Sequence, residues 1–73
     1  MVSDNQIEFQ IICDYESILK NAIKIYNQTY KTDFVLKEMI SDEVDFAKIV
    51  VSKYKTSDLF YLGAMYSRMS EKA

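Results

Sequence analysis

The chain has 73 residues, of which 49% are hydrophobic and 27% charged, with a formal net charge of −2 at pH 7. This length holds one domain, and this composition is that of a folded chain rather than a disordered one. With one cysteine and no histidine, the sequence excludes an internal disulfide and disfavours a structural zinc site. We expect a single small domain over residues 1–73, with no metal and no cofactor.

No segment resembles a secretory signal, and no run approaches the ~18 apolar residues of a membrane span. A lone thiol, Cys13, without an export signal is typical of a reducing compartment. We therefore expect a cytoplasmic protein that does not contact a membrane. Eight lysines beside a single arginine, Arg68, and eight isoleucines indicate an AT-rich genome, such as those of many bacteria and phages.

Glycine occurs once, at Gly63, and proline is absent. Strand-and-turn folds use these residues where the chain reverses, whereas both destabilise helix interiors. The composition therefore favours an all-α fold. We predict a small bundle of about four helices, with a long first helix, a short second one and a C-terminal antiparallel helix pair.

The first helix is predicted over residues 4–30. Ser3 is its expected N-cap, with Gln6 in the capping-box position, and Glu16 and Lys20 are spaced for an i,i+4 ion pair. Its apolar stripe consists of Ile7, Ile11, Tyr15, Ile18, Ala22, Tyr26 and Tyr30.

The start of this segment also fits a strand, because residues 6–11 alternate between polar and apolar side chains. The β-branched run at residues 48–52 is its natural partner. The alternative fold is therefore α+β, with a two-stranded sheet from residues 6–12 and 48–52 that rests on the helices. The helical interpretation is preferred because the stripe keeps its phase through residues 7–12.

Two helices are predicted in the centre of the chain. Thr32 is the expected cap of the first, which contains an Asp33–Lys37 pair at i,i+4. Ser41 is the expected cap of the second, whose acidic first turn, residues 42–45, suits the positive end of the helix dipole. That acidic group lacks the turn glycine and closing glutamate of a calcium loop.

The last helix is predicted over residues 58–69, after a break at residues 55–58. It is apolar on two sides, and such a helix is either central in its fold or shared with another chain. One side consists of Leu59, Leu62, Met65, Tyr66 and Met69, and the other of Phe60, Tyr61 and Ala64.

These patterns favour protein–protein interaction over catalysis. The chain has no histidine to act as a base, and a helical domain of this size has little room for a concave active site. Exposed apolar spots are expected on the first and last helices, where aromatic side chains are typical of interfaces. The predicted interface residues are Phe9, Cys13, Phe60, Tyr61, Gly63 and Ala64.

We therefore predict a non-catalytic binding module that associates with another protein and also with itself. It would be a small oligomeric adaptor or an inhibitor of a larger protein. A phage or mobile-element regulator that acts on a host enzyme or defence complex is a setting compatible with this composition.

The alternative function is a helix-turn-helix-like DNA-binding transcriptional regulator, with its turn at residues 55–58. Its phosphate contacts would be Lys48, Lys53, Lys55 and Arg68. The negative net charge and the apolar outward positions of the last helix argue against nucleic acid as the partner. No motif in the sequence is specific enough to indicate a family.

Overall fold

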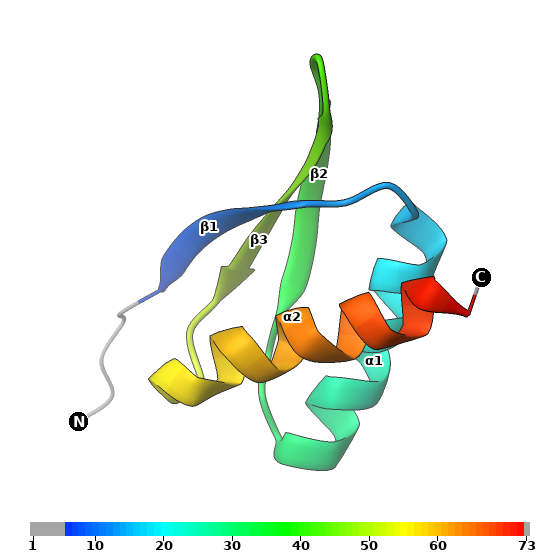
Figure 1. Ribbon diagram of the computed structural model, residues 1–73. Helices are drawn as coiled ribbons and strands as arrows, with labels where there is room; N and C mark the ends of the chain where they lie inside the picture. Colours follow the sequence, from blue (N-terminus) through cyan, green and yellow to red (C-terminus); the bar gives the residue numbers. More distant parts are fainter. Residues whose placement is uncertain (1–5, 73) are drawn as a thin grey trace.

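The computed structural model, which describes residues 6–72, contains two helices and a three-stranded antiparallel sheet (Figure 1). About 46% of residues 6–72 is helix and 30% is strand. The fold is therefore α+β, and the predicted all-α bundle of about four helices is wrong. In chain order the elements are β1 (Ile7–Ile12), α1 (Glu16–Tyr30), β2 (Val35–Ser41), β3 (Asp45–Val51) and α2 (Thr56–Glu71).

The sheet has the order β1-β3-β2, so β3 is the central strand. β1 runs antiparallel to β3 in an unbroken register that places Ile7 opposite Val51. β2 and β3 form a hairpin, and their register shifts between Leu36 and Glu38. Because alternate residues of a strand face opposite sides, the sheet has one apolar face and one mixed face.

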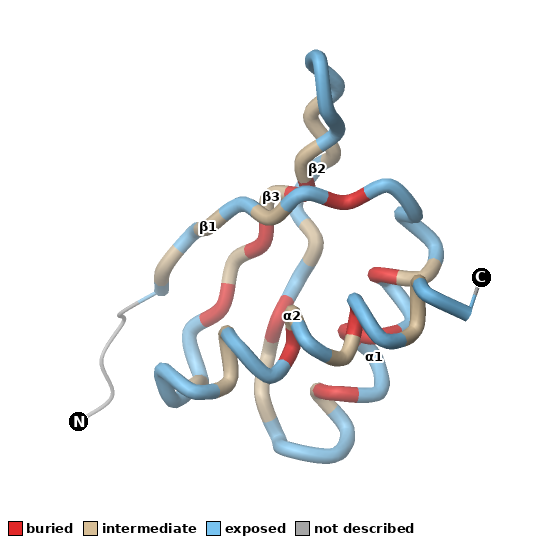
Figure 2. Tube along the Cα trace, in the orientation of Figure 1, coloured by how far each residue is buried: buried red, intermediate tan, exposed pale blue. Residues whose placement is uncertain are grey.

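Both helices cover the apolar face of the sheet, and the core lies between these two layers (Figures 1 and 2). Phe34 is central to it, because its ring meets Phe9 and Tyr26 edge-on at centroid distances of 6.2 and 5.8 Å. The largest fully buried side chains are Tyr26, Phe34, Leu19, Ile49, Leu62, Val51 and Cys13.

The chain turns from α1 into β2 without glycine. Lys31 takes the left-handed conformation with φ 61°, and its amide donates to the Asn27 carbonyl at 2.9 Å. The Asn27 side chain then bonds both backbone groups of Phe34, at 2.9 Å each, and accepts from the Thr32 hydroxyl at 2.8 Å. The Asn27 side chain therefore stabilises a chain reversal at which glycine or proline is often found.

A second polar contact ties this turn to the loop that follows β3. The Asp33 carboxylate accepts hydrogen bonds from the Ser52 hydroxyl and from the amides of Ser52 and Lys53, the latter two at 2.9 and 2.7 Å. Partial burial raises the pKa of Asp33, but these hydrogen bonds outweigh it and hold the pKa below its usual value. The predicted Asp33–Lys37 pair does not form, since Lys37 pairs with Glu8 at 3.1 Å.

The predicted first helix is too long. α1 begins at Glu16, and residues 7–12 are strand β1; Ser3 and positions 4 and 5 lie outside the described residues. The Glu16–Lys20 ion pair is confirmed at 3.2 Å. The alternative of a two-stranded sheet from residues 6–12 and 48–52 brought the right two segments together, but the paired residues are 7–12 and 46–51, and the sheet has a third strand.

The two predicted central helices are strands β2 and β3, and the acidic residues 42–45 surround the hairpin turn instead of starting a helix. The prediction for residues 58–69 is confirmed, since they lie within α2. Within residues 6–72, neither helix combines the length and the hydrophobicity needed to cross a lipid bilayer.

Candidate functional site

The side chains of α2 form three rows, because residues three and four apart share one side of a helix. One row, with Leu62 and Tyr66, is buried in the core. The second lines a groove against α1 and consists of Tyr61, Ala64, Met65, Arg68, Met69 and Lys72. The third, which we term the small row, consists of Gly63, Ser67 and Ser70 beside the end of β1, with Phe60 before them at helical spacing.

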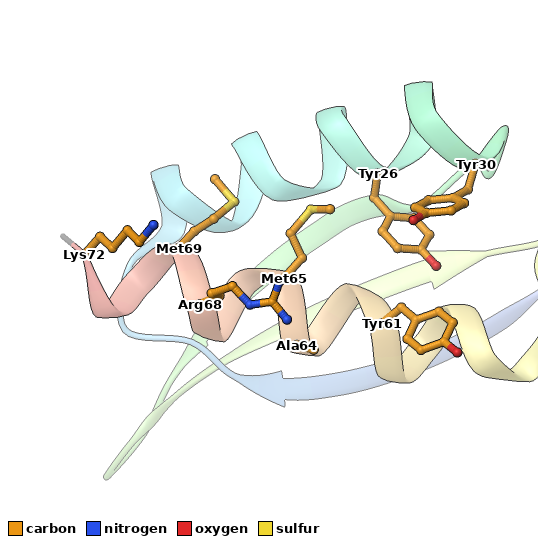
Figure 3. Close-up of a pocket in the computed structure, with 8 residues that line it drawn as sticks. All are labelled: Tyr26, Tyr30, Tyr61, Ala64, Met65, Arg68, Met69 and Lys72. Atoms are coloured by element: carbon orange, nitrogen blue, oxygen red, sulfur yellow. The ribbon is translucent and has the colours of Figure 1, made fainter.

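The groove between α1 and α2 has a volume of about 290 Å³. The two helices run antiparallel, since Tyr66 bonds the chain at the start of α1 and Asp58 bonds Tyr26 near its end. Tyr26 and Tyr30 enter the groove from α1, with ring centroids 4.5 Å apart, and Tyr61 faces them from α2 (Figure 3). Tyr30 and Tyr61 remain 55% and 59% exposed, so this aromatic end is open to a partner.

A hydrogen bond holds the aromatic end in place. The Tyr26 hydroxyl donates to Asp58 Oδ1 at 2.6 Å, while Asp58 Oδ2 accepts from the Lys55 amide at 2.8 Å and so caps α2. Burial and the neighbouring Asp58 carboxylate raise the pKa of Tyr26 far above its ordinary value. The hydrogen bonds from the Lys55 amide and the Tyr26 hydroxyl lower the pKa of Asp58. Tyr26 is therefore a neutral donor that fixes the spacing of the two helices.

The opposite end of the groove is cationic. Arg68 lies between Met65 and Met69 on α2, and Lys72, the C-cap residue of this helix, follows one turn later, at the end away from the tyrosines (Figure 3). None of the ion pairs among residues 6–72 includes Arg68 or Lys72. The groove thus has an aromatic end and an opposite end where two methionines and two cations alternate, so it offers both apolar contact and positive charge.

The structure separates the predicted interface residues into two sets. Phe60 and Tyr61 are 73% and 59% exposed on α2, with Ala64 exposed and Gly63 half-buried near them. Tyr61 and Ala64 line the groove, whereas Gly63 lies on the small row.

Phe9 and Cys13 lie elsewhere, and the expected exposed spot on a first helix does not exist. Phe9 is half-buried on the helix side of β1, where it contacts Phe34. Cys13 is only 1% exposed, next to Tyr66. A helix over residues 7–12 would turn both side chains outward, whereas the observed strand β1, which Cys13 directly follows, turns them towards the core.

The four predicted nucleic-acid contacts do not form one surface. Lys48 lies on the uncovered sheet face between Glu8 and Glu38, at 3.6 and 3.5 Å, so its charge is neutralised. Lys53 and Lys55 lie in the loop before α2, and Arg68 is in the groove. Because strand β3 precedes that loop, no pair of helices meets at residues 55–58, and the expected helix-turn-helix unit is absent there.

Sequence reasoning did not identify the α1 side of the groove. Tyr26 and Tyr30 belonged to the stripe of the long predicted helix, and Met65 and Met69 to a core face. The available signal was the spacing of Tyr61, Met65 and Met69, four residues apart, on a helix whose buried row was already supplied by Leu62 and Tyr66. A second apolar row of this kind indicates a further contact surface.

Models of protein families, curated protein sequences and solved structures were compared with the chain, and none of them matches it.

Proposed function

We propose that this chain is a non-catalytic protein-binding module whose α1–α2 groove binds an amphipathic helix with acidic residues. The observation that carries the proposal is the groove itself, which has two exposed tyrosines at one end, Tyr30 from α1 and Tyr61 from α2, and the methionines and cations of α2 and its C-cap towards the other. Such a module occludes or recruits a helix of a larger protein, as an inhibitor or an adaptor does.

The shape of the groove supports a helical partner. The row from Tyr61 to Lys72, the C-cap residue of α2, covers eleven residue steps, or about 16 Å, which matches about three turns of a helix laid along it. A helix bound in a groove inserts apolar residues spaced by three, four and seven positions. Tyrosine offers a large contact area at small entropic cost, and methionine adapts to the shape of its partner.

The charges support an acidic partner. Arg68 and Lys72 are the cations of the groove, and no carboxylate lines its walls in the part of the chain described. The chain as a whole carries a net charge of −2, so this positive end stands out from its surroundings. Opposite charge across an interface raises the association rate and discriminates against wrong partners.

The test uses two synthetic helical peptides with the same apolar face, one with glutamates and one with lysines beside it, each carrying a fluorescent label. The glutamate peptide is expected to bind and the lysine peptide to bind at least about tenfold more weakly, which corresponds to one partly desolvated ion pair. Tyr61→Asp is expected to abolish binding, and Arg68→Glu to reverse the charge preference.

Phe60→Asp is the matched control, because Phe60 is even more exposed than its neighbour Tyr61 but does not line the groove. This variant should bind the glutamate peptide like the original chain. The proposal fails if neither peptide binds, or if binding is indifferent to the charge of Arg68.

A further inference from the structure

We infer that two copies of this chain pair through the free edge of β1, so that their three-stranded sheets join into one continuous sheet. This surface is separate from the α1–α2 groove, and the inference does not depend on the proposed function. It explains two features that have no role within one copy, the open edge of β1 and the small row of α2.

Within residues 6–72, the outer edge of β1 pairs with no other strand. The Cys13 amide bonds the Asp45 carbonyl at 2.9 Å, and in an antiparallel ladder the bonded positions alternate. The backbone groups of residues 9 and 11 therefore point to β3, and those of Glu8, Gln10 and Ile12 point away from it. Among residues 6–72, no hydrogen bond of the sheet or of a side chain satisfies these outward groups.

The two edges of the sheet differ in a way that favours β1. β2 carries a register shift at its charged residues Lys37 and Glu38, and bulges and charges of this kind prevent edge-to-edge pairing. β1 has no register shift, and its one charged residue, Glu8, is paired with Lys37 and Lys48 of the same sheet. Gln10 is uncharged and Ile12 is 60% exposed, so nothing on this edge opposes another strand.

A second copy fits this edge because β1 is self-complementary about Gln10. A two-fold axis there places Gln10 opposite Gln10 of the second copy, and Glu8 opposite its Ile12. Each outward N–H then meets a carbonyl, and the two glutamates are not opposed. On the helix side, the half-buried Phe9 meets Ile11 of the second copy, which extends the apolar face across the axis.

The small row of α2 allows the helices of the two copies to approach each other when the β1 strands pair. Paired strands lie about 4.8 Å apart, whereas packed helices need about 8–10 Å, so a helix side that lies beside a joined β1 edge has room only for small side chains. Gly63, Ser67 and Ser70 lie on the side of α2 that borders Ile11 and Ile12. A Cβ atom at Gly63 would meet nothing within 4 Å inside one copy. Packing within one copy therefore does not require glycine at this position.

The test is the mass of the purified full chain over a range of concentrations, by light scattering and sedimentation, together with amide hydrogen exchange. We expect a dimer in which the Glu8, Gln10 and Ile12 amides are protected as well as those of Phe9 and Ile11. Gln10→Pro removes an outward N–H and should raise the dimer dissociation constant at least about tenfold. Gln10→Thr keeps that N–H and should leave the constant nearly unchanged.

Gly63→Leu is a second variant, in the open space beside α2, and should also raise the dissociation constant while circular dichroism remains unchanged. If Gln10→Pro unfolds the chain, Gly63→Leu alone tests the inference. The inference is overturned by a single-chain mass at every concentration, by a dimer with fast exchange at Gln10, or by folded Gly63→Leu that dimerises as the original chain does. Tyr61→Asp should not affect the dimer, which separates this surface from the groove.

Discussion

The Tyr26 hydroxyl on α1 and the Asp58 carboxylate on α2 are joined by a 2.6 Å hydrogen bond. Tyr26→Phe removes only this hydroxyl, and we expect the free energy of unfolding to fall by about 1–2 kcal/mol, because the acceptor is charged. Loss of the donor should also raise the pKa of Asp58 towards its ordinary value. Urea denaturation and an NMR titration of Asp58 measure the two effects.

Tyr30→Phe is the control for this variant, since the Tyr30 ring contacts that of Tyr26 at a tilt but its hydroxyl makes no hydrogen bond within residues 6–72. We expect it to leave the stability nearly unchanged. Equal losses in the two variants would mean that the hydroxyl of Tyr26 contributes no specific interaction between the helices.

Acid should destabilise the chain through Asp33 and Asp58. Their pKa values in the folded state lie below the ordinary value of about 3.9 for aspartate, so the unfolded chain binds protons first as the pH falls. The stability that these carboxylates contribute is complete above pH 5 and is lost as the pH falls below about 4 and through their folded pKa values. Urea midpoints measured from pH 7 to pH 2.5 should decline over that lower range.

Asp33→Asn supplies the comparison for this pH dependence. It should be less stable than the original chain at pH 7, because a neutral amide accepts the hydrogen bonds of Ser52 and Lys53 more weakly. The difference between the two chains should narrow at low pH, when Asp33 is protonated. A constant difference across the whole range would contradict a lowered pKa at Asp33.

The alternation of residues 6–11 was visible in the sequence, and its ambiguity has a physical cause. Ile7 and Ile11 are four apart, a spacing that places both on one side of a helix and also on one side of a strand. Phe9 separates the two cases, because it shares a side with Ile7 and Ile11 only in a strand, and it does so here. The same holds for Ala47 and Val51, with Ile49 between them.

The scarcity of glycine and proline misled the prediction for a different reason. The turn after α1 is made by Lys31 in a left-handed conformation and by the side chain of Asn27, and the hairpin turn contains no glycine. Composition could not reveal these local hydrogen bonds, which depend on long-range packing of Phe34. The last helix was predictable because its apolar residues are too dense to fit a half-buried strand.

Lys31 offers a test of that turn. We expect Lys31→Gly to stabilise the chain by about 1 kcal/mol, since glycine adopts the left-handed conformation without the steric cost that lysine bears. Thermal and urea unfolding measure this gain. Lys24→Gly, in the exposed middle of α1, is the matched control and should cost about 1 kcal/mol. A loss at both positions would contradict the left-handed conformation of Lys31.

Substitution of Gly63 should affect both the stability of one copy and the association of two copies. It lies inside α2, and an added Cβ would meet no atom within 4 Å. Measured in dilute solution, where one copy predominates, Gly63→Ala should therefore raise the free energy of unfolding by about 1 kcal/mol, the ordinary difference between these residues in a helix. Ala64→Gly, at the next position and exposed, should lower it by a similar amount.

At high concentration the outcome for Gly63→Ala should differ, because the new methyl group lies where two α2 helices approach each other. We expect part of the stability gain to be lost as the dimer forms, while Ala64→Gly shows the same deficit at every concentration. Urea midpoints at two widely separated concentrations give the comparison. A gain that does not depend on concentration would show that Gly63 is not part of a close helix contact, and a loss in dilute solution would mean that the space around Gly63 is already filled within one copy.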